Sequence, residues 1–405
     1  MNIYQSPLNL YVLWHPNYKA VKPKKDETPC TESCYGGKEY AEFIYSVFSR
    51  ELDNPLTRGI GIPTYYRSQK REDDSLRPID FHEAKRNAVV VLAEACMLED
   101  GDFKTFIRNL HDQHDGNAII FFFVMDKYGK RIDPSQNKRL YESIYEIEDT
   151  DVHSTFLKRC QKIREVLAHD LCRMLLDERP SFEDQKGAPS KAPIKLFLSH
   201  AREDGAVQAK AIHQHVYNQT KLDTFLDIQD IDTGDDIREK LVQQMGIDTA
   251  LVVIQTDEYS NRLWCQDELH HAKARSIPMV VVNDLKQGEK RAFPYLGNVP
   301  SIKWQNNSQA IIDLALIQVL RVWFSKKCLE ELANVYGIRN HYKCFTVGQP
   351  PELLDLVELG KNTRPRENHM ILYPDPPLSR VETRILRTAQ PQWVFATPAS
   401  LSQYL

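Results

Sequence analysis

The sequence predicts an α/β protein with two domains built on parallel sheets and a small C-terminal α/β module. Apolar runs of strand length alternate with amphipathic helical patterns in residues 194–326, and the same alternation occurs in residues 1–177. Strands separated by helices of this length form βαβ units, whose strands pair in parallel. Residues 178–193 contain three Pro, one Gly and mixed charge without apolar periodicity, which predicts a linker. Residues 327–405 form the third region.

The region 194–326 shows the alternation most clearly. Ala209, Ile212 and Val216 recur at i, i+3 and i+7, which predicts a helix after the first strand. A second helix is expected around Ile237, Leu241 and Met245, and a last one over 310–324. The expected strands are 196–198, 224–226, 250–254, 278–282 and 302–304. Ligands bind at the carboxyl ends of strands in such sheets, so the search for chemistry starts there.

The region 1–177 follows the same plan. Pro63 places its second expected strand at a sheet edge. The expected strands are 8–14, 59–66, 88–93 and 118–125, and the expected helices are 38–50, 102–113 and 153–176. The order of strands and helices matches that of 194–326, so this region is predicted to be a divergent copy of one fold.

The C-terminal region 327–405 is predicted to form a small α/β module. Ser379 is expected to cap the second of its helices. The expected strands are 342–347, 370–373 and 393–396, and the expected helices are 352–359 and 381–389. Two alternatives are open: an independent module, or an appendage packed on the central domain.

Composition argues against several classes of function. The chain has 52 Lys+Arg against 56 Asp+Glu, a net charge of −4, which does not indicate nucleic-acid binding through bulk charge. No apolar run approaches the length of a membrane span and no signal-peptide pattern is present, so we expect a cytoplasmic protein that binds no membrane. The eight Cys are scattered, and Cys30 and Cys34 lack a nearby second pair, so we expect no metal site.

Three motifs in order resemble the Toll/interleukin-1 receptor (TIR) domain, particularly the bacterial kind. They are the strand end Leu198-Ser199-His200, the second strand running into the BB loop (225–234), and the Trp-Cys-x-x-Glu box Trp264–Leu269. The resemblance covers about a third of the chain, roughly 194–324, and implies a flavodoxin-like fold for it. One departure is visible, because Arg262 stands where the family often has Ser.

The resemblance implies that Glu268 is the catalytic residue for cleavage of the N-glycosidic bond of NAD⁺. Loss of nicotinamide leaves an oxocarbenium-like ribose, which a fixed carboxylate stabilises. The alternative reading places Glu268 in the first turn of a helix, where an acidic residue complements the helix dipole. The sequence lacks a Gly-x-Gly-x-x-Gly fingerprint, so NAD⁺ is expected as a consumed substrate and no bound cofactor is expected.

Further substrate-binding residues follow from the resemblance. Arg202 suits a pyrophosphate, with a solvated loop charge as its alternative role. Trp264 is either an aromatic wall of the site or a core anchor. The full expected set of substrate-binding residues is Ser199, His200, Ala201, Arg202, Asp227, Asp232 and Trp264, and the BB loop is represented by Ile231 and Gly234.

The resulting hypothesis is a NAD⁺ glycohydrolase (TIR NADase), with cyclase activity as a variant, acting in bacterial anti-phage defence once it assembles. Self-association through TIR domains, including filaments, is expected from the family, together with a defence-system partner protein. The alternative is a non-catalytic TIR adaptor. The first region has 94–100 after its third strand in place of the Trp-Cys box, so it is expected to be non-catalytic. A further alternative is that the first region binds a nucleotide signal near His15 and Glu94.

Overall fold

The structure, a computed structural model, describes residues 3–17, 35–51, 59–72, 75–113, 116–132, 141–176, 194–220, 222–226, 245–246, 248–289, 291, 294–361, 363–364 and 367–404. For residues 111–113, 225 and 226 it describes the backbone alone. The chain forms two compact units, one containing Gln5–Leu167 and the other containing Ala168–Asp177 and Pro189–Leu405. The expected linker 178–193 and the expected helix around Ile237 and Leu241 lie outside the described residues.

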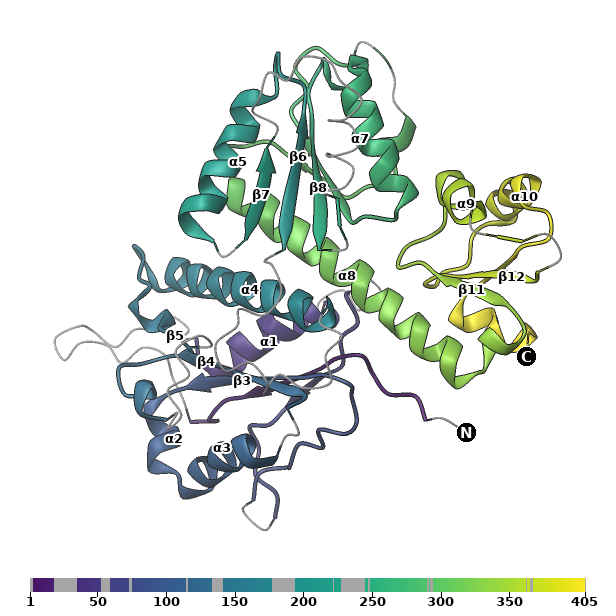
Figure 1. The fold of residues 1–405 in the computed structure, drawn as a ribbon. Helices are drawn as coiled ribbons and strands as arrows, with labels where there is room; N and C mark the ends of the chain where they lie inside the picture. Colours follow the sequence, from purple (N-terminus) through teal and green to yellow (C-terminus); the bar gives the residue numbers. More distant parts are fainter. Residues whose placement is uncertain are drawn as a thin grey trace. The chain divides into compact units, whose positions relative to one another are not determined.

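The first unit is built on a five-stranded parallel sheet with the order β2-β1-β3-β4-β5 (Figure 1). Its strands are β1 (Asn9–Leu13), β2 (Thr64–Tyr66), β3 (Asn87–Ala93), β4 (Ala118–Val124) and β5 (Tyr141–Glu142). Every residue of β3 is buried, as expected for an inner strand covered on both faces, which is why its sequence is continuously apolar. The edge position expected from Pro63 is confirmed, although only the last three residues of 59–66 pair as β2. The sequence did not predict β5.

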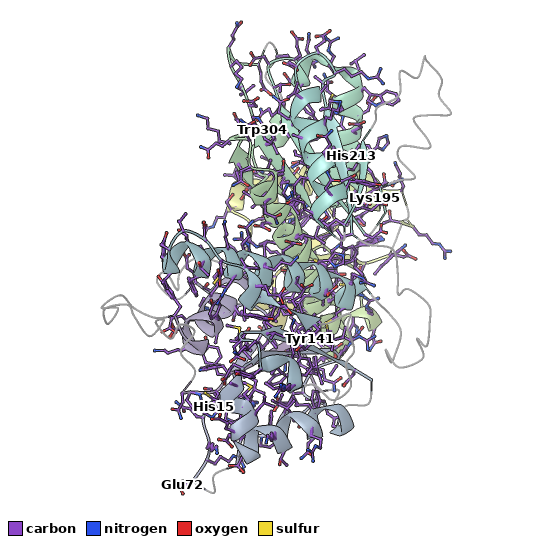
Figure 2. All side chains as sticks on the ribbon, turned by 90° about the vertical axis from the view of Figure 1, so that its left-hand side faces the viewer. His15, Glu72, Tyr141, Lys195, His213 and Trp304 are labelled. Atoms are coloured by element: carbon purple, nitrogen blue, oxygen red, sulfur yellow. The ribbon has the colours of Figure 1, made fainter. Side chains whose placement is uncertain are left out.

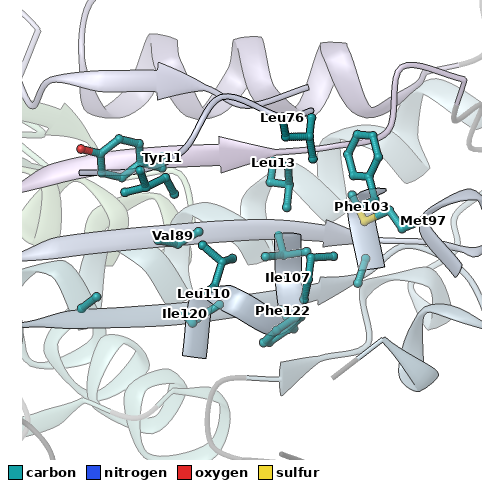
Figure 3. Close-up of a cluster of buried hydrophobic side chains, with 14 of the residues drawn as sticks. Tyr11, Leu13, Leu76, Val89, Met97, Phe103, Ile107, Leu110, Ile120 and Phe122 are labelled. Carbon is teal, nitrogen blue, oxygen red and sulfur yellow. The ribbon is translucent and has the colours of Figure 1, made fainter. Parts of the chain in front are cut away.

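The helices of the first unit agree with the expected ones, with one addition, the five-residue helix α2. They are α1 (Gly37–Phe48), α2 (Ala95–Glu99), α3 (Gly101–Gln113) and α4 (Val152–Leu176), with the 3₁₀ turns η1 (Gly129–Arg131) and η3 (Ile144–Glu146). The residues of α4 from Ala168 onward belong to the second unit. In one core cluster, Leu13 and Val89 of the sheet pack against Ile107 and Leu110 of α3 (Figure 3). Each such buried aliphatic side chain contributes about 1.5–3 kcal/mol.

The second unit contains a five-stranded parallel sheet with the order β10-β9-β8-β6-β7. Its strands are β6 (Lys195–His200), β7 (Asp223–Leu226), β8 (Thr249–Gln255), β9 (Met279–Asn283) and β10 (Ser301–Lys303). All five strands expected in this region are confirmed. In both sheets the first strand lies between the second and the third, so both have the flavodoxin-like order, with a topological switch point between the first and third strands.

Helices and short turns complete this domain. They are α5 (Ala206–Gln219), η4 (Tyr259–Asn261), α7 (Leu263–Ala274), η5 (Pro294–Leu296) and α8 (Ser308–Val335). The side chain of Asn307 caps α8 by accepting a hydrogen bond from the backbone N–H of Ala310 at 3.1 Å. Figure 2 labels His213 on α5. The Nδ1 of His213 lies 2.6 Å from Oγ1 of Thr224 on β7, a hydrogen-bond distance.

Helix α8 is 28 residues long, well beyond the expected 310–324. By length and apolar composition it meets the criterion for a membrane span, contrary to the sequence expectation that no such stretch exists. However, 67% of its apolar window is buried inside the protein. Its first part packs on β8 and β9, and its last part packs on β11 of the C-terminal module. These contacts fit a core helix of a folded domain.

The C-terminal module is a three-stranded parallel sheet with the order β11-β12-β13. Its elements are η6 (Ile338–Asn340), β11 (Lys343–Thr346), α9 (Leu353–Gly360), β12 (His369–Leu372), α10 (Arg380–Ala389), β13 (Val394–Ala396) and η7 (Pro398–Tyr404). Ser379 is the N-cap of α10, as expected, and accepts a hydrogen bond from the N–H of Glu382 at 3.2 Å. The expected strands and helices of this region are confirmed.

The module packs on the central domain, which favours the second of the two alternatives left open by the sequence. Lys273, near the end of α7, lies 2.7 Å from Glu352, the N-cap of α9. The hydroxyl of Ser276 donates to Asp355 of α9 at 2.7 Å. Lys273 and Asp355 are 6% and 4% exposed, so these polar contacts are sheltered from water.

Candidate active site

The site lies at the switch point of the second sheet, where β6 and β8 are direct neighbours. Ser199 and His200 are the last two residues of β6, and they pair with Val253 and Ile254 of β8. The chain leaves β8 through η4 and enters α7, which carries Glu268. The fold therefore brings the end of the first strand and the helix after the third strand to one place, as the motifs predicted.

A chain of hydrogen bonds holds Glu268. The Ser199 hydroxyl donates to Oε2 of Glu268 at 2.5 Å, and the hydroxyl oxygens of Ser199 and Tyr259 are 2.8 Å apart. A serine hydroxyl has one proton, so when it donates to the carboxylate the Tyr259 hydroxyl must donate to it. Burial, and then the neighbouring Cys265 and Glu268, raise the pKa of Tyr259 well above its ordinary value, so the phenol keeps that proton.

The three side chains joined by these hydrogen bonds are buried. Tyr259 is 0% exposed, Ser199 is 1% exposed and Glu268 is 7% exposed. Hydrogen bonds to an ionised group in such surroundings are stronger than those between neutral groups. The arrangement therefore fixes the orientation of one carboxylate, which can stabilise positive charge that develops beside it.

The sequence did not predict Tyr259, and the only available signal was an aromatic residue shortly after the third strand. Its position depends on η4, where Gln266 of α7 donates to the carbonyl of Ser260 at 2.8 Å and holds the turn against the helix. Such a contact depends on the folded turn and cannot be read from spacing alone.

The structure corrects one reading of Glu268. Helix α7 begins at Leu263, and its first turn contains no acidic residue. Glu268 lies in the second turn, because the helix starts earlier than the apolar pattern suggested, so it is not placed to complement the helix dipole at the N-terminus. The first-turn reading is therefore wrong.

Trp264 and Cys265 divide two roles at the start of α7. Trp264 is 38% exposed, which does not fit the core anchor considered for it, whereas Cys265 is 2% exposed and belongs to the core cluster. Burial and the charge of Glu268 raise the pKa of the Cys265 thiol, so it is an unreactive core residue.

The loop after β6 is tied to the turn after β8. Asp204 accepts hydrogen bonds from the Thr256 hydroxyl at 2.6 Å and from the backbone N–H of Glu258 at 3.1 Å. Arg262, the departure from the family pattern, is the N-cap residue of α7 without a side-chain cap; it forms ion pairs with Glu203 and Glu258 instead. These bonds hold the two loops of the switch point together.

The other expected site residues differ in their surroundings. Arg202 is exposed in the loop after β6, and Ala201 is buried, with its carbonyl accepting the N–H of Gly205 at 2.8 Å. The ring of His200 is half-buried, with Nδ1 3.5 Å from the carbonyl of Leu198 on its own strand. The expected BB-loop and strand-end residues lie outside the described residues, and these are Asp227, Ile231, Asp232 and Gly234.

Comparison with known proteins identifies the domain. A family model described as the TIR domain matches residues 196–315. No curated protein matches the chain in sequence. Among solved structures, the chain is similar to tagatose-6-phosphate ketose/aldose isomerase from Escherichia coli, with 11% identity over 78% of this chain and 82% of that chain and a TM-score of 0.23, a likeness too weak to support an argument. The family match, the flavodoxin-like strand order and the placement of Ser199 beside Glu268 together show that residues 196–315 are a TIR domain.

Proposed function

We propose that this TIR domain cleaves the bond between nicotinamide and ribose in NAD⁺, with Glu268 as the catalytic residue. The observation that carries the proposal is the buried carboxylate of Glu268, held by Ser199 at the switch point of the sheet. Ligands of open parallel sheets bind outside the strand ends at this point.

The chemistry needs one well-placed carboxylate. The bond between the ribose anomeric carbon and the nicotinamide nitrogen breaks, and its electron pair leaves with nicotinamide, which departs as a neutral molecule. Positive charge then builds on the ribose, and Glu268 stabilises it. Water adds to the anomeric carbon and loses a proton to give ADP-ribose; attack by a group of the same nucleotide would give a cyclic product.

The test compares purified full-length protein with Glu268→Gln, measuring NAD⁺ loss and nicotinamide release with and without a crowding agent that promotes assembly. We expect the substitution to lower the rate about 100- to 1,000-fold, the usual loss when a group that stabilises transition-state charge is removed. Asp267→Asn is the matched control, because it makes the same change in the neighbouring residue of α7 and should keep the activity. Equal activity of Glu268→Gln and wild type would refute the assignment.

An adaptor that acts only by binding other TIR domains is the second candidate. It is favoured by apolar side chains exposed at the start of α7, where Leu263 is 73% exposed next to Trp264. Association through this surface would also serve an enzyme that is active only when assembled. The two candidates separate in cells, because toxicity on expression that disappears with Glu268→Gln supports the enzyme, and toxicity unchanged by that substitution supports the adaptor.

The biological setting that we propose is bacterial anti-phage defence in the cytoplasm, by depletion of NAD⁺ or by an ADP-ribose signal. The support is the TIR domain at 196–315 joined to further α/β elements. Phage challenge of cells carrying wild type or Glu268→Gln tests this setting; protection that does not depend on Glu268 would contradict it.

A further inference from the structure

The first unit brings three metal-binding side chains together at the switch point of its own sheet. His15 follows β1 by two residues, Glu94 directly follows β3, and Cys96 is in α2. Strands β1 and β3 are paired neighbours, with Leu13 beside Val91. Figure 2 labels His15 in the first unit.

The distances and donor atoms suit a small cation. One ligand atom from each side chain can be chosen so that all three lie within 4.8 Å of one another. Zinc bond lengths of about 2.0–2.3 Å in a tetrahedral site place ligand atoms roughly 3.5 Å apart. Side-chain rotations that move the ligand atoms by about 1 Å therefore close the set around an ion. A thiol and an imidazole select zinc-like ions over magnesium or calcium, which prefer oxygen ligands throughout.

Glu94 supplies an independent observation. Its side chain is 0% exposed, and its Oε2 caps α2 by accepting the backbone N–H of Cys96 at 2.7 Å. Its other oxygen, Oε1, is buried and accepts no N–H or O–H hydrogen bond, and the only side chain that interacts with the carboxylate as a donor among the described residues is the weakly donating Cys96 thiol. A buried carboxylate oxygen without a partner is unfavourable, and metal coordination is one of the few ways to satisfy it.

Both ring nitrogens of the buried His15 have polar neighbours. Its ring is 6% exposed, and Nε2 lies 3.5 Å from Oδ2 of Asp100. The same oxygen of Asp100 is 2.8 Å from the ammonium of Lys70. A carboxylate that accepts from one ring nitrogen orients the other toward the metal. Here that other nitrogen is Nδ1, which accepts the backbone N–H of Asn17 at 3.2 Å and would exchange this bond for the ion.

We propose that His15, Glu94 and Cys96 bind one Zn²⁺ ion at the switch point of the first sheet. Three protein ligands leave a fourth position for water, the pattern of zinc sites that exchange a ligand. The sequence placed His15 and Glu94 near each other at the strand ends, as an alternative site for a nucleotide signal, but it did not add Cys96 or predict a metal there. The proposal concerns the first unit and does not depend on the proposed NAD⁺ cleavage.

The test uses full-length protein freed of metal with a chelator, then exposed to Zn²⁺ and passed through gel filtration. We expect one zinc per chain by mass spectrometry of the metal. Cobalt(II) in place of zinc should give a thiolate-to-metal charge-transfer band. Cys96→Ser should abolish this band and weaken zinc binding more than about 100-fold. Asp100→Asn, which changes a residue beside His15 and not a ligand, should weaken zinc binding only about 10- to 100-fold.

Two controls address the other cysteines. Cys344→Ser changes another half-buried thiol in the second unit and should keep both the zinc and the cobalt band. The double variant Cys30→Ser/Cys34→Ser removes the close pair noted in the sequence and should also keep both. The proposal fails if wild type retains no zinc, or if Cys96→Ser retains as much zinc as wild type. Circular dichroism of each variant distinguishes lost binding from lost folding, and Glu94→Gln, which keeps the size of the side chain, gives a second test of the set.

Discussion

The two five-stranded sheets of this chain share one strand order but present different side chains at their switch points. In the second unit a serine hydroxyl, Ser199, holds a carboxylate, Glu268, which belongs to the helix after the third strand. In the first unit the corresponding ends of the first and third strands bring together an imidazole, a carboxylate and a thiol from His15, Glu94 and Cys96. The strand order decides where two loops meet, and the loop residues decide the chemistry.

The helices after the third strands explain much of this difference. Strand β8 leads through η4 into the twelve-residue α7, whereas β3 leads at once into the five-residue α2. The carboxylate of α7 comes from its second turn, and the carboxylate of α2 is its N-cap, Glu94. In addition, the far end of α7 is bonded to the C-terminal module through Lys273 and Ser276, so the helix that carries Glu268 is held at both ends.

The largest effect is expected for Asp355→Asn, a substitution at the contact between α7 and the module. Burial raises the pKa of Asp355 to about 6, from an ordinary value of 3.8, despite the bond from Ser276. Because the pKa of Asp355 is higher in the folded state than in the unfolded state, protonation of Asp355 adds to the free energy of unfolding. This contribution is complete below about pH 4 and is lost as the pH rises through 6. The shift corresponds to about 3 kcal/mol. Asp355→Asn should lack this loss.

Urea unfolding of wild type and Asp355→Asn at several pH values between 4 and 7 measures the difference. We expect the free energy of unfolding of the variant, relative to wild type, to rise across this range. Glu358→Gln changes a half-exposed carboxylate of the same helix, paired with Lys361; it is the control and should show no such rise. Parallel pH profiles for Asp355→Asn and wild type would contradict the expectation.

The second effect sharpens the contrast between the two switch points by removing the serine that only one of them has. Ser199→Ala removes a hydrogen bond to a charged group, worth about 1.5–3 kcal/mol, so NAD⁺ cleavage should slow roughly 10- to 100-fold. Ser260→Ala is the matched control, because Ser260 is equally buried and its hydroxyl has no hydrogen-bond partner. Similar rates for the two variants would show that Ser199 does not position Glu268.

A smaller effect is expected at Tyr259. Tyr259→Phe keeps the buried ring and removes only the hydroxyl that donates to Ser199, a neutral hydrogen bond worth about 0.5–1.5 kcal/mol. The rate of NAD⁺ cleavage should fall about 2- to 10-fold with little change in KM. Tyr217→Phe, at an exposed position on α5, should leave the rate unchanged. A loss at Tyr259 as large as that for Glu268→Gln would mean that the phenol contacts the substrate.

The smallest effect is expected at Arg262, where the chain departs from the family. Arg262→Ser removes half-exposed ion pairs to Glu203 and Glu258, which contribute about 0–1 kcal/mol. It also supplies a serine N-cap for α7, which stabilises the helix by a similar amount. The free energy of unfolding should therefore change by less than about 1 kcal/mol in a denaturant titration. A loss above about 2 kcal/mol would show that these ion pairs hold the two loops more strongly than exposed pairs normally do.

Much of the fold followed from apolar periodicity, because β3 and β8 are inner strands whose burial on both faces leaves a continuous apolar signature. The meeting of Ser199 and Glu268 also followed from the motifs. The start of α7 was misplaced, since the apolar Leu263 and Trp264 are exposed and do not continue the buried face formed by Leu269 and Ala272. Strand β5 was missed because its two residues are too few to show a period.

Tyr259 was missed for a different reason. It lies at the start of η4, and its hydroxyl reaches Ser199 only because the turn and α7 are folded against each other. By contrast, His15 and Glu94 were expected near each other at the strand ends, and the pairing of β1 with β3 brings them together; the presence of Cys96 beside them was not predicted. Local patterns fix strands and helices, whereas contacts across two loops depend on the assembled sheet.

The length of α8 fixes how the C-terminal module is rotated about the helix axis relative to the central sheet. Its first part packs on β8 and β9, while Leu329 and Ala333 pack against Met370 and Leu372 of the module. One residue inserted midway would turn the module by about 100° and shift it about 1.5 Å along the axis. Seven inserted residues would nearly restore the direction but add about 10 Å. The angular phase of one continuous helix thus decides whether α9 can meet the end of the helix that carries Glu268.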